Sequence, residues 1–420
     1  MSAPARLGQV ASHLNGSKAP RTQVGVKSPD DVVIVKALRT PITRARKGGF
    51  KDTTSEYLLG AILRGIVETT KIDPKLVEDI CVGNVCPPGG GAVTARMASL
   101  YAGFPNTTCV QTVNRQCSSG LQAVVHIAHE IQSGMIDIGI GAGVESMTQF
   151  YGPKNKMIPD TISDEVMAAP EVGDCLIPMG FTSENVSKDF GIPRSKQDAF
   201  AALSHQRAEK AQKEGLFDAE IYPVKTKIVD KDGNEKEIVV SRDDGVRAGT
   251  TAESLGKLRP AFSADGSTTA GNASQVSDGA AAVLLMKRSR AMELGLPIEG
   301  KLVASAVAGV PPRIMGVGPA YAVPAVLKKA NMSIDQLEIV ELNEAFASQA
   351  VYSIEKLGLD INNVNPKGGA IAFGHPLGCT GARQISTLLT ELKRQNKRVG
   401  CTTMCIGGGF GMAAIFESEH

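Results

Sequence analysis

The chain has 420 residues, a formal net charge of +2 and a hydrophobic content of 42%. This length and composition allow a large buried core in one to three domains. The balanced charge excludes a nucleic-acid binder built on a basic stripe, and no apolar run reaches the roughly 20 residues that span a bilayer. The eight cysteines form no C-x-x-C pair. We therefore expect neither a disulfide framework nor a metal site.

Residues 1–28 differ from the rest of the chain and are predicted to be a targeting segment. They contain basic but no acidic residues, and they lack the apolar core of a secretory signal. Arg6-Leu7, five residues and then His13-Leu14 resemble the N-terminal peroxisomal signal R-L-x5-H-L. We expect a peroxisomal protein that meets an import receptor through this segment. A mitochondrial transit peptide is the alternative.

The folded part begins with a β-branched run at residues 32–35 that predicts a buried strand. Strand-like and helix-like segments then alternate, as in layered α/β folds, and the series occurs twice in the same order. The sequence thus predicts two similar halves packed face to face, with the site where they meet. The matched segments are 72–73, 80–84, 113–114, 121–131 and 138–141 in the first half, and 334–335, 339–343, 364–365, 382–392 and 403–407 in the second.

Three glycine-rich turns carry the residues that predict the chemistry. Cys117 lies in NRQCSSG (114–120), directly before the first-half helix. The partial positive charge at the helix start is expected to lower the pKa of its thiol. His375 and Cys405 lie in similar turns in the second half. A thiol, an imidazole and a second thiol in such turns indicate covalent catalysis on a thioester or carbonyl.

Between the two halves, from about residue 151 to 270, the composition becomes charged and polar. We interpret this segment as an insertion that covers the site and binds the bulky part of a substrate. The predicted organisation is a targeting segment, a first half, a loop domain, a return to the first half and a second half. The corresponding ranges are 1–28, 29–150, 151–268, 269–296 and 297–420.

Four motifs in this order resemble those of the thiolases. They are NRQCSSG, NEAFA (343–347), GHPLGCTG (374–381) and CIGGGFG (405–411), supported by TAGNASQVSDGAA (269–281). The resemblance runs from residue 30 to the end and is greatest to the peroxisomal 3-ketoacyl-CoA thiolases of fungi. It implies a duplicated α/β fold, with two five-stranded mixed sheets in a layered αβαβα sandwich plus a loop domain. It also implies a homodimer or a dimer of dimers.

The resemblance implies cleavage of a 3-ketoacyl-CoA by CoA, giving acetyl-CoA and a shortened acyl-CoA in fatty-acid β-oxidation. Cys117 is then the nucleophile that carries the acyl group, His375 its base, and Cys405 the general acid and base. Asn343 holds a water that completes one oxyanion site with His375, and the N–H groups of Cys117 and Gly407 form another. No bound cofactor or metal is implied, because CoA is a co-substrate.

The resemblance further implies a set of contacts to the substrate. Short-chain biosynthetic thiolases typically have a histidine directly before the Met-Gly pair of the cover loop. This chain has Pro178 at that position. We therefore expect a pocket that accepts medium and long acyl chains. The implied contacts are Arg247 at the nucleotide end, Ser254 and Ser274 on the pantetheine arm, Leu258 and Phe262 along it, Met315 and Phe346 nearer the thioester, and Met179 in the cover loop.

Two other interpretations compete with this one. A condensing enzyme of the ketoacyl synthase type shares the fold, but it usually pairs its cysteine with two histidines or with histidine and asparagine. A catalytically silent acyl-CoA carrier is disfavoured because Cys117, His375 and Cys405 are all retained. The sequence leaves open whether Cys117 and Cys405 form an inhibitory disulfide, and whether the assembly is a dimer or a tetramer.

Overall fold

The computed structural model describes residues 22–152, 158 and 160–420. The predicted targeting residues Arg6, Leu7, His13 and Leu14 therefore lie outside the described residues. The first half forms a sheet in the order β4-β3-β5-β8-β1, and β2 (Thr43–Arg44) pairs with β8. Its elements are β1 (Val32–Arg39), α2 (Ser55–Thr70), β3 (Asp79–Gly83), α3 (Ala92–Tyr101), β4 (Cys109–Val113), α4 (Ser119–Ser133), β5 (Ile138–Ser146), β8 (Ser277–Lys287) and α10 (Arg288–Glu293).

The second half repeats this order as β10-β11-β12-β9. In the first half the β3/β4 and β3/β5 pairs are parallel, and the β5/β8 and β8/β1 pairs are antiparallel. In the second half the β10/β11 pair is parallel, and the β11/β12 and β12/β9 pairs are antiparallel. The fifth strand is reduced to one parallel bridge between Val340 and Val364. The elements are β9 (Gly300–Gly309), α11 (Gly318–Ala330), β10 (Ile339–Leu342), α12 (Ala347–Leu357), α13 (Ala370–Phe373), α14 (Leu377–Arg394), β11 (Val399–Ile406) and β12 (Phe410–Ser418).

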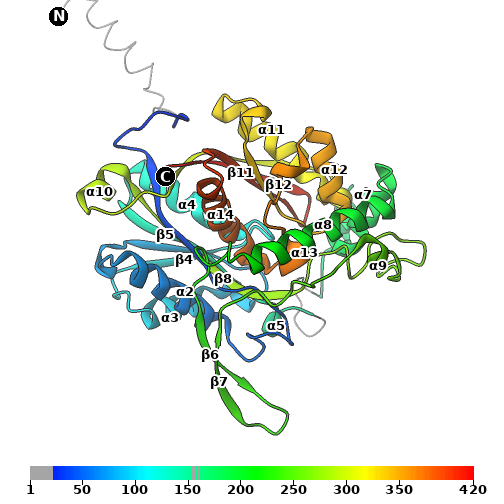
Figure 1. Cartoon of the computed structure of the whole chain (residues 1–420), viewed down its shortest axis with the longest axis horizontal. Helices are drawn as coiled ribbons and strands as arrows, with labels where there is room; N and C mark the ends of the chain where they lie inside the picture. Colours follow the sequence, from blue (N-terminus) through cyan, green and yellow to red (C-terminus); the bar gives the residue numbers. More distant parts are fainter. Residues whose placement is uncertain (1–21, 153–157, 159) are drawn as a thin grey trace, which may run out of the picture.

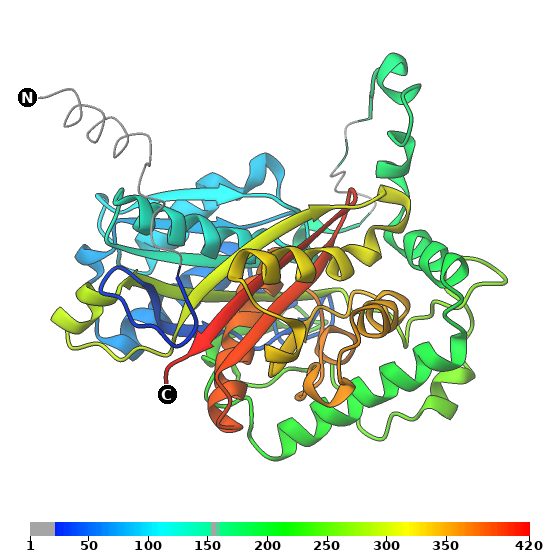
Figure 2. The ribbon, with the colours of Figure 1, turned by 90° about the horizontal axis from the view of Figure 1, so that it is seen from above.

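The two sheets join at their edges. β1 and β9 pair antiparallel at Val33 with Lys301 and at Ile34 with Gly300, so hydrogen bonding continues from one half into the other. Figure 2 shows β9, β11 and β12 slanting across the molecule beside α11. The predicted duplicated α/β fold with mixed sheets is confirmed. The edge junction and the shortened fifth strand are details that the sequence did not predict.

Three apolar clusters define the layers. The central cluster contains residues of α4 and α14 together with side chains from both sheets, and these two helices lie at the centre of Figure 1. A second cluster covers the outer face of the first sheet with α2 and α3. A third covers the second sheet with α11 and α12. The result is the expected α-β-α-β-α stack.

The first turns of α4 and α14 approach closely because both contain glycine. A Cβ on Gly120 would lie 2.6 Å from the Gly378 carbonyl oxygen, and a Cβ on Gly381 would lie 2.3 Å from the Leu121 nitrogen. Neither backbone could remain where it is with a larger residue. These contacts place the starts of the two central helices, and the turns before them, side by side.

The inserted segment is anchored by buried ions. Glu220 accepts from Arg39 of the first half at 2.7 Å and from Lys367 of the second half at 2.6 Å. Asp243 also accepts from Arg39 at 2.7 Å, and all four side chains are buried. Burial alone would raise the pKa of Glu220, but the charges of Lys367 and Arg39 outweigh it and lower that pKa to about 2.

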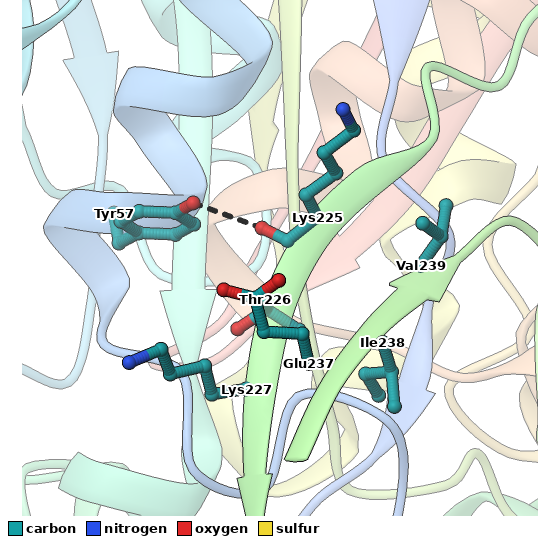
Figure 3. A pocket seen from close by; sticks show the side chains of 7 residues that line it. All are labelled: Tyr57, Lys225, Thr226, Lys227, Glu237, Ile238 and Val239. Atoms are coloured by element: carbon teal, nitrogen blue, oxygen red, sulfur yellow. Dashed lines mark hydrogen bonds between the residues drawn. The ribbon is translucent and has the colours of Figure 1, made fainter. Parts of the chain in front are cut away.

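The rest of the insertion packs mainly on the second half. Apolar residues of α7 and α8 belong to the third cluster beside α12. The β6–β7 hairpin projects from the body (Figure 1), and the Tyr57 hydroxyl of α2 donates to the Lys225 carbonyl at its base (Figure 3). The remaining elements are α5 (Met147–Phe150), α6 (Asp164–Met167), α7 (Met179–Asp189), α8 (Arg194–Lys213), β6 (Val224–Val229), β7 (Glu235–Val240) and α9 (Ala252–Gly256), with 3-10 turns at Pro74–Leu76, Pro88–Gly91, Gly173–Leu176, Pro312–Val317, Ile334–Gln336 and Ile361–Asn363.

Candidate active site

Cys117 lies in a tight turn two residues before α4 begins at Ser119. Gln116 has φ 46°, a left-handed conformation that is uncommon for a residue with a side chain. Its N–H donates to Asn114 Oδ1 at 2.9 Å, and its carbonyl accepts from the Ser119 hydroxyl at 2.6 Å. These bonds hold the turn in the conformation that turns Cys117 inward.

The surroundings of Cys117 correct the expected pKa. The helix start was expected to lower it, but burial raises the pKa of the Cys117 thiol to about 11, although the N–H groups of Gly407 and of Cys117 itself donate to the sulfur. Desolvation disfavours the thiolate by more than these donors favour it. The free thiol is therefore protonated at neutral pH, and its reaction needs a neighbouring base.

His375 comes from the second half, two residues before α14 begins at Leu377. Its Nδ1 lies 2.6 Å from the Thr380 hydroxyl, which also lies 3.0 Å from the Pro376 carbonyl oxygen. Because that carbonyl only accepts, it takes the single hydroxyl hydrogen, and Nδ1 must donate to Thr380. Nε2 is then the unprotonated nitrogen, and it accepts from Asn343 Nδ2 at 3.2 Å.

The electrostatic environment keeps His375 neutral. Burial, and then the charge of Arg383, lower the pKa of the imidazole to about 3. Asn343 is also buried, and its Oδ1 has no hydrogen-bond partner among the described residues. Nε2 carries no hydrogen, so it can accept a proton in place of the bond from Asn343 Nδ2. The two residues then present N–H donors side by side, which suits an oxyanion.

Cys405 lies near the end of β11 and is fully buried. Burial, and then the neighbouring Cys117, raise the pKa of its thiol. Its sulfur donates to Gln349 Oε1 at 3.0 Å, and Gln349 Nε2 donates to the Asn343 carbonyl at 3.2 Å. Cys405 is therefore connected through Gln349 to the residue beside His375.

Two buried carboxylates hold the turns. Glu145 accepts from the N–H groups of Val85, Cys86 and Gly378 at 3.1, 3.1 and 2.9 Å, so it joins the first half to the His375 turn. Burial raises the pKa of Glu145 to about 7. In the second half, Glu344 accepts from side chains of the insertion and of the second half and from the Ile371 N–H at 3.1 Å. It supports the loop before His375 and accepts from an N–H in the first turn of α13.

The expected substrate contacts fall into two groups. Met315 and Phe346 form a buried cluster with Cys405, against which Met179 packs. Phe262 is exposed, and its ring meets that of Phe346 edge to face with the ring centroids 6.5 Å apart. The members of the second group lie farther out: Arg247, Ser254 and Leu258 are exposed, and Ser274 is half-buried.

The structure brings Cys117, His375, Asn343, Cys405 and Gly407 together from both halves. Gln349, Thr380 and Glu145 were not predicted from the sequence. Thr380 and Gln349 lie within or just after the GHPLGCTG and NEAFA motifs, which is the signal that could have indicated them. Within the described ranges, no group of three or more histidine, cysteine or acidic residues could hold a metal ion. No described helix has the length and apolarity needed to cross a bilayer.

Comparison with known proteins identifies the family. Residues 32–289 match the thiolase N-terminal domain, and residues 296–418 match the thiolase C-terminal domain. The chain belongs to the thiolase family. It is 58% identical to the peroxisomal 3-ketoacyl-CoA thiolase A of Rattus norvegicus, over 93% of this chain and 89% of that protein. The peroxisomal 3-ketoacyl-CoA thiolase of Yarrowia lipolytica is 54% identical over 99% of this chain and 100% of its own length.

Solved thiolase structures are also similar. The dimeric peroxisomal thiolase of Saccharomyces cerevisiae has a TM-score of 0.87 at 50% identity and covers 94% of this chain and 99% of that one. An acetyl-CoA acetyltransferase of Bacillus anthracis has a TM-score of 0.83 at 39% identity, over 93% and 99%. The predicted family membership is therefore confirmed, and the ketoacyl synthase interpretation is not supported.

Proposed function

We propose that this thiolase cleaves 3-ketoacyl-CoA with CoA, giving acetyl-CoA and an acyl-CoA shortened by one acetyl unit, in fatty-acid β-oxidation. One observation carries the proposal. A buried thiol that is protonated at rest, Cys117, shares a site with a neutral imidazole whose Nε2 carries no hydrogen and with a second buried thiol, Cys405. Such a site can form an acyl-thioester and also handle the proton of the leaving group.

The first half-reaction forms the acyl-enzyme. His375 Nε2 takes the Cys117 proton, and the sulfur attacks the 3-keto carbon. The N–H groups of Cys117 and Gly407, which already point at this sulfur, stabilise the oxyanion that forms. The bond between C2 and C3 then breaks. Protonated His375 and Asn343 stabilise the enolate of acetyl-CoA, and Cys405 donates its proton to C2.

The second half-reaction transfers the acyl group to CoA. The Cys405 thiolate takes the proton of the incoming CoA thiol, and the CoA sulfur attacks the acyl carbonyl. Collapse of the tetrahedral intermediate releases the shortened acyl-CoA, and Cys117 regains its proton from His375. Both cysteines end the cycle protonated, so no metal ion or bound cofactor has to take part. The expected kinetics are ping-pong.

The substrate contacts follow from this assignment. We assign Arg247 and Ser254 to the nucleotide and pantetheine parts of CoA, with Ser274 and Leu258 along the arm. Phe262, Met179, Met315 and Phe346 line the approach to the thioester, since the last three pack around Cys405. The chain-length preference for medium and long acyl groups, based on Pro178, is tested by comparing kcat/KM for acetoacetyl-CoA and 3-ketododecanoyl-CoA. A clear preference for acetoacetyl-CoA would contradict it.

We assign residues 1–28 to peroxisomal targeting, 29–150 and 269–296 to the first half, 151–268 to the loop domain and 297–420 to the second half. The peroxisomal relatives support this location. A reporter fused to residues 1–28 tests it, because import should be lost on Arg6→Ala or His13→Ala. A mitochondrial signal that neither change affects would contradict the assignment.

We also propose a homodimer, as the yeast relative is dimeric. β4 lies at the edge of the first-half sheet, and the neighbouring α3 exposes Val93, Met97 and Leu100. An edge strand beside exposed apolar side chains is a surface at which a second copy can pair. Analytical ultracentrifugation of Met97→Glu tests this, with weaker association expected. A dimer of unchanged affinity would place the interface elsewhere.

Mass spectrometry tests the reaction directly. The protein is mixed briefly with 3-ketododecanoyl-CoA without free CoA. We expect a decanoyl adduct on the Cys117 peptide, formed together with acetyl-CoA, and its release as decanoyl-CoA when CoA is added. Cys117→Ser should give no adduct, whereas Cys175→Ser, at an exposed cysteine, should react normally. Recovery of intact thioester with no adduct would overturn the proposal and favour a carrier.

A further inference from the structure

Gln349 of α12 connects two parts of the site and has no role in the reaction as described above. It is fully buried and lies two residues after the NEAFA motif. Its Nε2 donates to the Asn343 carbonyl oxygen at 3.2 Å, and its Oε1 lies 3.0 Å from Cys405 Sγ. Gly316 leaves room for this side chain, since a Cβ there would lie 2.7 Å from Gln349 Cβ.

The hydrogen-bond pattern fixes which way the amide points. A backbone carbonyl can only accept, so the NH2 group of Gln349 must face Asn343. Oε1 is then directed at Cys405, and an amide oxygen can also only accept. The sulfur must therefore be the donor, which requires the protonated thiol. A thiolate at this position would face the lone pairs of the amide oxygen in a buried site.

The two thiols of the site thus have opposite partners. Each sulfur lies by its own backbone N–H, and the Cys117 sulfur also receives the N–H of Gly407, which favours the thiolate. The Cys405 sulfur is held by the acceptor Gln349 Oε1, which favours the thiol. Both sulfurs are buried, so desolvation acts on both in the same direction. What differs between them in hydrogen bonding is the Gly407 N–H at Cys117 and the Gln349 oxygen at Cys405.

We propose that Gln349 is a positioning residue that keeps Cys405 protonated and oriented as the acid of the site, and so protects it from electrophiles while Cys117 reacts. In the catalytic cycle the S–H bond of Cys405 breaks as the C–H bond at C2 of the acetyl-CoA enolate forms. The sulfur recovers a proton from the CoA thiol, and Gln349 Oε1 again accepts from it. The acid step rests on the proposed function, whereas the protection from electrophiles does not.

The test measures the alkylation of each cysteine separately. The full-length protein is treated with iodoacetamide at pH 8, and modification of the Cys117 and Cys405 peptides is followed by mass spectrometry. Gln349→Met has a similar size but offers no amide oxygen or N–H. If the thiol pKa falls by one unit on loss of the acceptor, Cys405 should react roughly tenfold faster. Cys117 in the same sample is the internal control and should change less than twofold.

Gln349→Glu is the matched variant. A protonated carboxyl can keep both hydrogen bonds, and a carboxylate would oppose the Cys405 thiolate by its charge. Either way Cys405 should react no faster than in the native protein. This variant keeps the proposal testable if Gln349→Met does not fold, which melting temperature and circular dichroism reveal. Faster Cys405 alkylation in Gln349→Glu would overturn the proposal. So would native-like alkylation of Cys405, or equal acceleration of both cysteines, in Gln349→Met.

A kinetic readout separates this inference from the proposed function. The rate of the acetyl-CoA burst from 3-ketododecanoyl-CoA should fall as pH rises, because Cys405 then loses its proton. In Gln349→Met this fall should begin at a lower pH than in the native protein. An unshifted burst profile would contradict the acid role. Failure of the proposed function appears elsewhere, as absence of the acyl-Cys117 adduct in the native protein, and leaves the alkylation result unaffected.

Discussion

Thr380 is expected to control the base of the site without touching the substrate. Its hydroxyl lies 2.6 Å from His375 Nδ1 and 3.0 Å from the Pro376 carbonyl. Thr380→Val keeps the shape but removes the acceptor, so Nδ1–H is left unpaired in a buried site. The imidazole can avoid this only by moving its hydrogen to Nε2, the nitrogen that must accept the Cys117 proton.

The magnitude follows from the lost hydrogen bond. Leaving a buried donor unpaired costs about 1–3 kcal/mol. If this cost favours the wrong tautomer, the active tautomer falls to a minority and the rate falls by about fivefold to 150-fold. We expect this loss in kcat for thiolysis and in the rate of Cys117 alkylation, with KM for CoA little changed.

Thr380→Ser is the matched control, because it restores the hydroxyl while lacking the methyl group. It should recover most of the rate at a similar melting temperature. Stopped-flow measurement of acetyl-CoA release on all three proteins gives the comparison. A Thr380→Val enzyme with native kcat, or a Thr380→Ser enzyme as slow as Thr380→Val, would refute the tautomer argument.

Three further expectations follow from buried groups. Burial raises the pKa of Glu145 to about 7, so the protonated carboxyl stabilises the fold below its unfolded pKa, and this contribution is lost as pH rises through about 7. The free energy of unfolding should therefore fall by up to about 3 kcal/mol between pH 4.5 and 8. Chemical denaturation of Glu145→Gln should lack this pH-dependent component. Lys367→Met removes one partner of a buried ion pair and should lower the free energy of unfolding by about 3–5 kcal/mol. Lys196→Met, at an exposed pair, should lower it by at most about 1 kcal/mol. Equal losses of unfolding free energy in chemical denaturation would contradict this expectation. A Cβ on Gly180 would lie 2.2 Å from the Phe262 ring, so Gly180→Ala should displace that ring. We expect KM for 3-ketododecanoyl-CoA to rise several-fold while the alkylation rate of Cys117 stays unchanged. A native KM would show that Phe262 does not line the approach of the substrate to the thiols.

Much of the fold was predictable because its signals are local. The β-branched run at residues 32–35 became β1, and the apolar spacing at 121–131 and 382–392 became α4 and α14. The duplication was visible because both halves keep the same order of segments. The junction of β1 with β9 was not predictable, since two edge strands that meet leave no pattern in either sequence.

The site was predictable in its residues and less so in its electrostatics. Cys117, His375 and Cys405 stand in glycine-rich turns, which marks them in the sequence. The pKa of Cys117 was predicted in the wrong direction, because the sequence shows the helix start but not the depth of burial. Thr380 and Gln349 were missed for a related reason. Their roles depend on which atom each side chain faces, and that is set by packing between segments far apart in the chain.

Cys117 and His375 stand at corresponding positions of the two repeats, each two residues before a central helix. A symmetric pair of identical half-length chains would place two thiols or two imidazoles there, and neither pair supplies both a nucleophile and its base. Joining the repeats in one chain removes that constraint, because each copy can then change independently. The near-symmetric scaffold thus supports chemistry that has to be asymmetric. Exchanging the Cys117 turn and the His375 turn between the repeats would show whether the scaffold distinguishes them.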